Sequence, residues 1–258
     1  MIESQAGFFT HHPETLRQQL DSVLGTSHRE IDPSIMVAPY GTLQDIGSIC
    51  GTLYGSLTSV PNSVVLLGAN EASTSAVAYP DEDINTPLGS ITVDTMFKQR
   101  LGMSDEAVID NTAFSISRSL LPHIAFLKHL REDITLSPLL LSPSTDADHL
   151  EEVTTVLSNL LTPEDMILVV GRLGRERVRD PDEVKMKLQR TDSGFITEMR
   201  QRNRREIIEY GKEHSIDLAG PLALALGLRG PQHFQMMGHR TWIDDHHDLV
   251  GGCIGYYR

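Results

Sequence analysis

Basic residues, cysteines and aromatic residues are all scarce in this 258-residue sequence. Its 22 lysines and arginines stand against 35 acidic residues, which gives a formal net charge of −13. That charge disfavours nucleic acid or an anionic membrane surface as the main partner. The only two cysteines, Cys50 and Cys253, stand in apolar segments far apart in the chain. We therefore expect free buried thiols in a reducing cytoplasm rather than a disulfide.

Long apolar runs and a leader-like start are also missing. No apolar run approaches the roughly 18–20 residues that a membrane span requires. The first residues, MIESQAGFF, lack the basic region and the apolar stretch of a secretory signal. No Gly-x-Ser-x-Gly, Gly-x-Gly-x-x-Gly, Cys-x-x-Cys or His-x-x-x-His motif occurs, so the common nucleophile, dinucleotide and zinc signatures are absent. We expect a cytoplasmic protein and predict no cofactor.

Apolar β-branched runs alternate along the chain with amphipathic helical segments. Buried strands are predicted at residues 35–38, 63–67, 135–141 and 166–170, and helices at residues 13–24, 41–57, 114–130 and 146–161. This alternation predicts an α/β fold, with a mainly parallel sheet sandwiched by helices. Residues 233–244 and 250–257 are predicted to be extended, at an antiparallel edge. Because no linker or internal repeat is visible, we expect one domain over residues 1–258.

Glycines and polar side chains follow three of the predicted strands. Tyr40 follows the first strand, Asn70 and Glu71 follow the second, and Arg172 and Arg175 follow the last. In open α/β sheets, ligands bind outside the carboxyl ends of the strands. The sequence therefore predicts a crevice lined by these five residues, although strand ends also need such residues simply to turn.

Several segments together resemble one known family in content and order. Thr86-Pro87-Leu88-Gly89 matches a Thr-Pro-Leu-Gly segment of the MEMO family closely, and Ala6-Gly7-Phe8-Phe9 is similar to that family's opening Ala-Gly-x-Phe-Tyr-Pro. Asp192 and the closing Gly255-Tyr256 also fit. MEMO proteins are the protein B partners of the AmmeMemoRadiSam grouping, and they share their fold with class III extradiol dioxygenases. The resemblance covers nearly the whole chain and implies that fold here.

The positions that the family would offer to a metal carry other residues in this sequence. Tyr40 and Glu71 stand where the resemblance implies histidines, and Ala113-Phe114 where it implies a Glu-His pair. Arg172 and Arg175 replace an Asp and a His. The family's cysteine near the last helix is missing from residues 217–222. An iron or copper site needs two or three converging imidazole, thiolate or carboxylate donors, and a guanidinium is not one of them. We expect no metal at this site.

The same replacements favour a binding or regulatory module with an anion-accepting crevice. Arg172 and Arg175, with Gly171 and Gly174 exposing backbone N–H groups, would hold a carboxylate or a phosphate. A second reading is structural, with both arginines paired to Glu71, Glu176 and Asp180. The alternative function is an enzyme of the extradiol-dioxygenase-like fold that uses displaced metal ligands, or a metal-free acid–base catalyst that uses Glu71 and Tyr40, with Glu71 as base.

Charge is distributed unevenly along the chain. Half of the lysines and arginines lie in residues 172–205, within an otherwise acidic protein. Such asymmetry favours an acidic protein partner or a homo-oligomer, beside the plain reading of a solvated helix face. His246 and His247 lie among three aspartates, but adjacent residues of an extended segment point to opposite faces. We expect them in a surface loop.

Overall fold

The computed structural model describes residues 2–3, 10–25, 30–71, 75–117, 119–178, 181–230, 232–244 and 246–258. The segment Ala6-Gly7-Phe8-Phe9, which carries part of the resemblance, lies outside the described residues, as does Asp180.

The helices and strands follow the predicted alternation over most of the chain. The helices are α1 (Pro13–Val23), α2 (Leu43–Tyr54), α3 (Thr95–Gly102), α4 (Asn111–Ile116), α5 (Leu121–Leu130), α6 (Ala147–Leu157), α7 (Pro181–Gln201), α8 (Arg204–His214) and α9 (Ala219–Arg229). The strands are β1 (Ile2–Glu3), β2 (Ile35–Pro39), β3 (Ser63–Ala69), β4 (Val77–Tyr79), β5 (Ile84–Thr86), β6 (Gly89–Val93), β7 (Val108–Ile109), β8 (Thr135–Leu141), β9 (Met166–Gly171), β10 (Arg175–Arg177), β11 (Phe234–Ile243) and β12 (Asp248–Tyr257).

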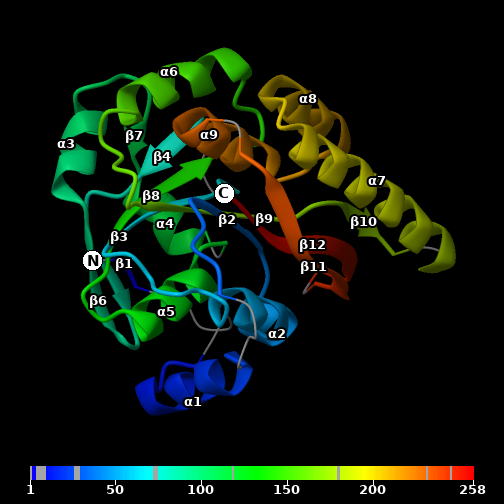
Figure 1. The fold of residues 1–258 in the computed structure, drawn as a ribbon, viewed down its shortest axis with the longest axis horizontal. Helices are drawn as coiled ribbons and strands as arrows, with labels where there is room; N and C mark the ends of the chain where they lie inside the picture. The colour runs from blue at the N-terminus through cyan, green and yellow to red at the C-terminus, as the bar shows by residue number, and fades with distance from the viewer. Residues whose placement is uncertain are drawn as a thin grey trace.

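These strands form one mixed sheet whose centre is parallel. Its order is β1-β5-β6-β8-β3-β9-β2-β12-β10, with β11 paired to β12 and β4 paired to β8. The pairs β8–β3, β3–β9 and β9–β2 are parallel, whereas β12 joins β2 antiparallel and pairs with β11 as a long hairpin. The mainly parallel α/β sheet and the antiparallel edge at the end of the chain are therefore confirmed (Figure 1).

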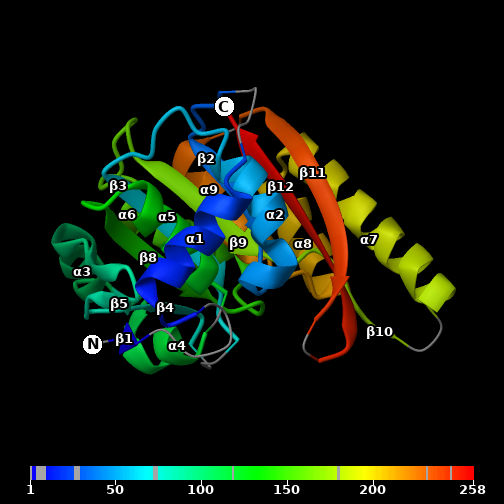
Figure 2. The same cartoon turned by 90° about the horizontal axis from the view of Figure 1, so that it is seen from below.

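Helices cover both faces of the sheet, and each face has its own apolar core. One core joins the sheet to α1, α2, α4 and α5, and the other joins it to α3, α6, α7, α8 and α9. Figure 2 shows α1, α2 and α5 on the near face and α7 and α8 on the far one. Strands buried on both faces explain the continuous apolar runs of β2, β3 and β9. Among the described residues, no helix is both long and apolar enough to cross a bilayer.

Glycines of α2 allow α1 and α2 to come into close contact. A Cβ atom at Gly51 would overlap the carbonyl group of Val23 at the end of α1. Thr42 begins α2 by accepting a hydrogen bond from the Asp45 N–H, and its own hydroxyl donates to the Asp45 carboxylate at 2.7 Å. The helix of the β2–α2–β3 crossover is thus fixed at its start and along the face that packs on α1.

The single helix predicted over residues 114–130 is wrong, because the structure has two helices there. α4 ends at Ile116, Ser117 is extended, and α5 begins at Leu121 with Pro122 in its first turn. Proline lacks an N–H and its ring clashes with the carbonyl four residues earlier in a continuous helix, but it is tolerated in a first turn. Pro122 therefore starts a new helix rather than continuing the old one.

Candidate functional site

Three neighbouring strands end at the same edge of the sheet and carry the predicted site residues. β9 lies between β3 and β2, so Arg172 after β9 lies between Glu71, beyond β3, and Tyr40, after β2. The backbone N–H of Tyr40 donates to the Gly171 carbonyl at 3.3 Å and so extends the β2–β9 ladder by one residue. Because parallel strands share an edge, three segments that are far apart in the sequence meet here.

Arg172 is the centre of this edge, and its guanidinium is already paired. Its Nη2 forms an ion pair with Glu71 Oε1, and its Nε donates to Asp217 Oδ2 at 2.6 Å. The guanidinium carbon lies 4.5 Å from the centroid of the Tyr40 ring. Its side chain is only 8% exposed, and a charge buried to that degree needs partners of opposite sign. Two carboxylates and an aromatic face supply them. We call this cluster of Tyr40, Glu71, Arg172 and Asp217 the Arg172 crevice, after the crevice that the sequence predicts at this edge.

Asp217 is the member of this crevice that sequence reasoning missed. It lies just before α9, and the next residue, Leu218, donates its N–H to the Arg172 carbonyl at 3.2 Å. A Cβ atom at Gly171 would lie 2.6 Å from Leu218 Cα, so only glycine fits between β9 and α9. The close approach of these two backbones brings Asp217 to Arg172. The one signal in the sequence was a lone acidic residue directly before an apolar helix.

Asn70, directly after β3, forms hydrogen bonds with two backbone carbonyl groups. Its backbone N–H donates to the Leu141 carbonyl at 2.7 Å, which continues the β3–β8 ladder. Its side-chain amide donates to the Ser75 carbonyl at 3.3 Å, and the residue is 3% exposed. Asn70 thereby ties residue 70 to residue 75 and positions the adjacent Glu71.

Arg175 lies in a different cluster from the one predicted. Its Nε donates to Asp248 Oδ2 at 2.9 Å and its Nη2 lies 3.2 Å from Asp244 Oδ2, both at the β11–β12 turn. The cause is β10, which pairs antiparallel with β12 and carries Arg175 to that hairpin. Glu176, the predicted partner of the arginines, pairs instead with Lys187 at 2.7 Å.

The N–H of Gly174 is not exposed, contrary to the prediction. It donates to Asp192 Oδ1 at 2.8 Å, and Asp192 is 1% exposed. The other oxygen of Asp192 lies 2.6 Å from Nε2 of His239 on β11. This buried carboxylate from α7 therefore holds the turn after β9 against the hairpin, and the Gly174 N–H has no capacity left for a ligand.

A buried histidine contacts the end of β2, next to the Arg172 crevice. His123 on α5 is fully buried, with Nε2 2.9 Å from the Pro39 carbonyl and Nδ1 2.9 Å from the Tyr54 hydroxyl. Because a carbonyl only accepts, Nε2 carries the proton and Nδ1 accepts from Tyr54. Desolvation lowers the pKa of His123 to about 4. A neutral imidazole thus fixes the end of β2, one residue before Tyr40.

Among the residues of this edge that the structure describes, no three metal donors converge. Within the described part of the chain, no group of three or more histidine, cysteine, aspartate or glutamate residues could hold a metal ion. The two carboxylates of the crevice, Glu71 and Asp217, both pair with Arg172. Cys50 and Cys253 are free and buried, as predicted, and burial raises the pKa of both thiols. His246 and His247 are exposed at the turn between β11 and β12, which confirms the surface loop.

Comparisons with known proteins agree with this architecture. A family model described as "Memo-like protein" matches residues 3–247. Among solved structures, the chain is similar to an uncharacterised protein, JW3007 from Escherichia coli K12, with a TM-score of 0.53 and 12% sequence identity. The similarity covers 87% of this chain and 99% of the other. At that identity the likeness shows the fold alone. No curated protein matches this sequence.

Proposed function

This chain belongs to the Memo-like family, and from that premise we propose that it is a metal-free, non-catalytic binding module whose ligand is a small carboxylate or phosphate. The observation that carries the proposal is the place of Arg172. Its guanidinium stands at the strand edge where the resemblance implies a metal centre, between Glu71 and Asp217. The three charged groups together carry a formal charge of −1, so the guanidinium would accept an anion only in place of one of these carboxylates.

Glu71 is the partner that an incoming anion would replace. Its side chain is 34% exposed, against 15% for Asp217 and 8% for Arg172. Arg172 Nη2 therefore faces the more open side of the crevice, while its Nε is held by the more buried carboxylate. A ligand carboxylate or phosphate would take the Nη2 contact from Glu71 while Asp217 and the Tyr40 ring keep the guanidinium in place.

The enzymatic alternative has less support from the same contacts. A general base must be able to reach a substrate proton, and the Glu71 carboxylate already accepts from Arg172. The ring of Tyr40 faces the guanidinium. Both candidate groups thus act within the protein's own ion-pair cluster.

The decisive experiment measures anion binding after removal of the competing carboxylate. Inorganic phosphate and succinate are titrated calorimetrically into wild-type protein, Glu71→Gln and Arg172→Met. Glu71→Gln is expected to raise the affinity for both probes by about tenfold, because the ligand no longer displaces a charge. Arg172→Met is expected to abolish binding. Unchanged affinity in Glu71→Gln would overturn the anion site and leave the ion pair as a structural feature.

A matched control lies elsewhere in the molecule. Arg204 pairs with Glu151 at 2.7 Å between α8 and α6, so Glu151→Gln removes one negative charge from another arginine. It is expected to leave the affinity for both anions unchanged.

Metal content tests the other half of the proposal. Protein prepared without metal-affinity resin is expected to contain iron, copper and zinc well below one equivalent. A full equivalent that disappears in Glu71→Ala would contradict the metal-free assignment.

A further inference from the structure

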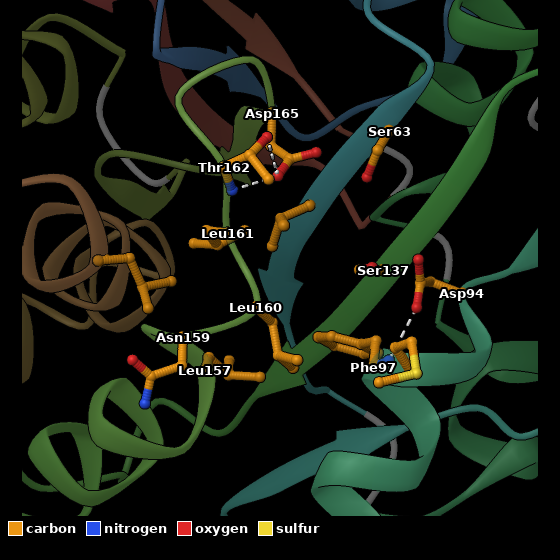
Figure 3. A pocket seen from close by; sticks show the side chains of 13 residues that line it. Ser63, Asp94, Phe97, Ser137, Leu157, Asn159, Leu160, Leu161, Thr162 and Asp165 are labelled. Atoms are coloured by element: carbon orange, nitrogen blue, oxygen red, sulfur yellow. Dashed lines mark hydrogen bonds between the residues drawn. The ribbon is translucent and has the colours of Figure 1, made fainter.

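A second hollow lies at the opposite end of the sheet, over the amino-terminal halves of β3 and β8. Its volume is about 380 Å³, within the range of small-molecule sites. Ser63 and Val65 of β3 and Ser137 of β8 contribute to its lining, and α3, the end of α6 and the loop 159–165 surround it (Figure 3). We call it the amino-end pocket.

This pocket is separate from the Arg172 crevice. α9 connects the two, since its start at Leu218 contacts Arg172 and its later residue Leu228 lines the pocket. Ten residues of helix span about 15 Å. A ligand in one site would therefore not touch the other.

Most of the pocket is apolar, but one buried hydroxyl is left without a partner. Apolar surface comes from Leu157, Leu160, Leu161 and Phe97. Ser137 is 4% exposed, and its side chain has no hydrogen-bond partner among the described residues. Its neighbours along the same face of β8, Leu139 and Leu141, pack in the core beneath α6 and α9. A serine in that row, facing a hollow, offers a ligand both a donor and an acceptor.

The charged groups in the lining are carboxylates. Asp94 Oδ1 accepts from the Phe97 N–H at 2.8 Å, and Asp165 Oδ2 accepts from the Thr162 N–H at 2.6 Å. Each carboxylate thus uses one oxygen to cap a turn and keeps a second. No lysine, arginine or histidine is among the described lining residues. Arg229, outside the lining, donates to the backbone carbonyls of Thr162 and Asp165, and its charge interacts with the Asp165 carboxylate, so Asp94 is the carboxylate with less competition for a cation.

We propose that the amino-end pocket binds a small molecule with an apolar body and a cationic amine. The apolar body would pack against the leucines and Phe97. The amine would lie near the free oxygens of Asp94 and Asp165, and the Ser137 hydroxyl would form a hydrogen bond with a polar group of the ligand. Figure 3 shows Asp94 and Ser137 on one side of the hollow and Asp165 on the other. Two carboxylates disfavour an acidic ligand of the same shape.

Three probes of nearly equal shape test the charge preference. 2-Phenylethylamine, 2-phenylethanol and phenylacetate are titrated into the full chain and followed by protein-observed NMR. The amine is expected to bind in the millimolar range or more tightly, and about tenfold more tightly than phenylacetate. No amine binding up to about 10 mM, or equal binding of amine and acid, would overturn the proposal.

Two variants locate the binding. Asp94→Asn with Asp165→Asn keeps both caps, because asparagine caps as well as aspartate, and is expected to remove the preference for amine over alcohol. The matched control is Asp110→Asn with Asp146→Asn, which removes two negative charges from the N-caps of α4 and α6. This control variant should still bind the amine more tightly than the alcohol. Ser137→Leu fills the hollow and is expected to abolish binding of all three probes. If Ser137→Leu does not fold, a preference that survives in the paired asparagine variant overturns the proposal by itself.

Discussion

At the carboxyl ends of β2, β3 and β9, the buried charges are paired with one another, whereas at the amino ends of β3 and β8 polar groups face an open pocket. Arg172 has two carboxylates and an aromatic ring around it. Ser137, which is 4% exposed, has no hydrogen-bond partner for its side chain within the described part of the chain. In the first arrangement the charged groups satisfy one another, so the loss of any member leaves another unpaired. In the second, the polar groups keep hydrogen-bonding capacity for a ligand. The two ends should therefore respond differently to mutation.

The largest difference is expected from Arg172→Met. It leaves Glu71 and Asp217 as uncompensated charges, and removing one partner of a buried ion pair costs about 3–5 kcal/mol of unfolding free energy. Arg175→Met is the matched control, because Arg175 also bridges two aspartates but its side chain is 33% exposed. Solvent screening reduces that loss to about 1 kcal/mol. Equal losses in urea unfolding would contradict the distinction between the two arginines.

Acidification is expected to weaken the crevice end through His123. The unfolded chain binds a proton at the ordinary histidine pKa near 6.5, whereas the folded chain does so only at about 4. Below pH 6.5 the unfolded state therefore holds the extra proton, and stability falls as the pH drops towards 4. The full loss from this residue is about 3 kcal/mol, with no further change below pH 4.

Comparing variants isolates this effect from the other titrating groups. His123→Gln removes the titration, so the difference in unfolding free energy between it and wild type should shrink between pH 7 and pH 4. His129→Gln is the control, since His129 bonds to the exposed Asp21 at 2.7 Å and its substitution leaves His123 in place. A constant difference across this range for His123→Gln would show that His123 titrates normally.

The contact between β9 and α9 is expected to be the next most sensitive feature. Gly171→Ala places a Cβ atom 2.6 Å from Leu218 Cα, and backbone moves less readily than a side chain. The expected loss in thermal or urea unfolding is about 2 kcal/mol. Gly220→Ala, in the same helix with nothing within 4 Å of the added atom, should instead stabilise by about 0.5–1 kcal/mol. A neutral Gly171→Ala would mean that α9 shifts freely against the sheet.

The sequence predicts the fold better than the site, for a physical reason. Runs such as residues 64–67 and 166–170 are apolar throughout, so strand, burial and parallel pairing follow from local composition. Chain position also predicts that Tyr40, Glu71 and Arg172 meet, because parallel strands end at one edge. Arg175 is only three residues beyond Arg172, but β10 turns it to the hairpin. No local signal specifies that antiparallel pairing.

Partners supplied by distant elements could not be foreseen in the same way. Asp217 lies just before α9 and Asp192 lies on α7, so the places of both depend on how these helices pack over the sheet. The amino-end pocket is less predictable still, because it is a gap between α3, α6 and α9 rather than a motif. Ser137 interrupts the apolar run of β8, and that interruption is the one trace of the pocket in the sequence.

The smallest effect on stability is expected from Ser137→Ala, at the amino-end pocket. Ser137→Ala removes a buried hydroxyl that has no partner, so it leaves no other group unsatisfied. We expect the unfolding free energy to change by less than about 0.5 kcal/mol, because Ser137 lines the open pocket and its hydroxyl has no hydrogen bond with the described residues to lose. Thr154→Val is the control and should cost about 1 kcal/mol or more, because the Thr154 hydroxyl donates to the Leu150 carbonyl at 2.6 Å and accepts from Arg204 Nη2 at 3.3 Å. A loss at Ser137→Ala as large as that at Thr154→Val would show that the Ser137 hydroxyl stabilises the protein itself and is not held open for a ligand.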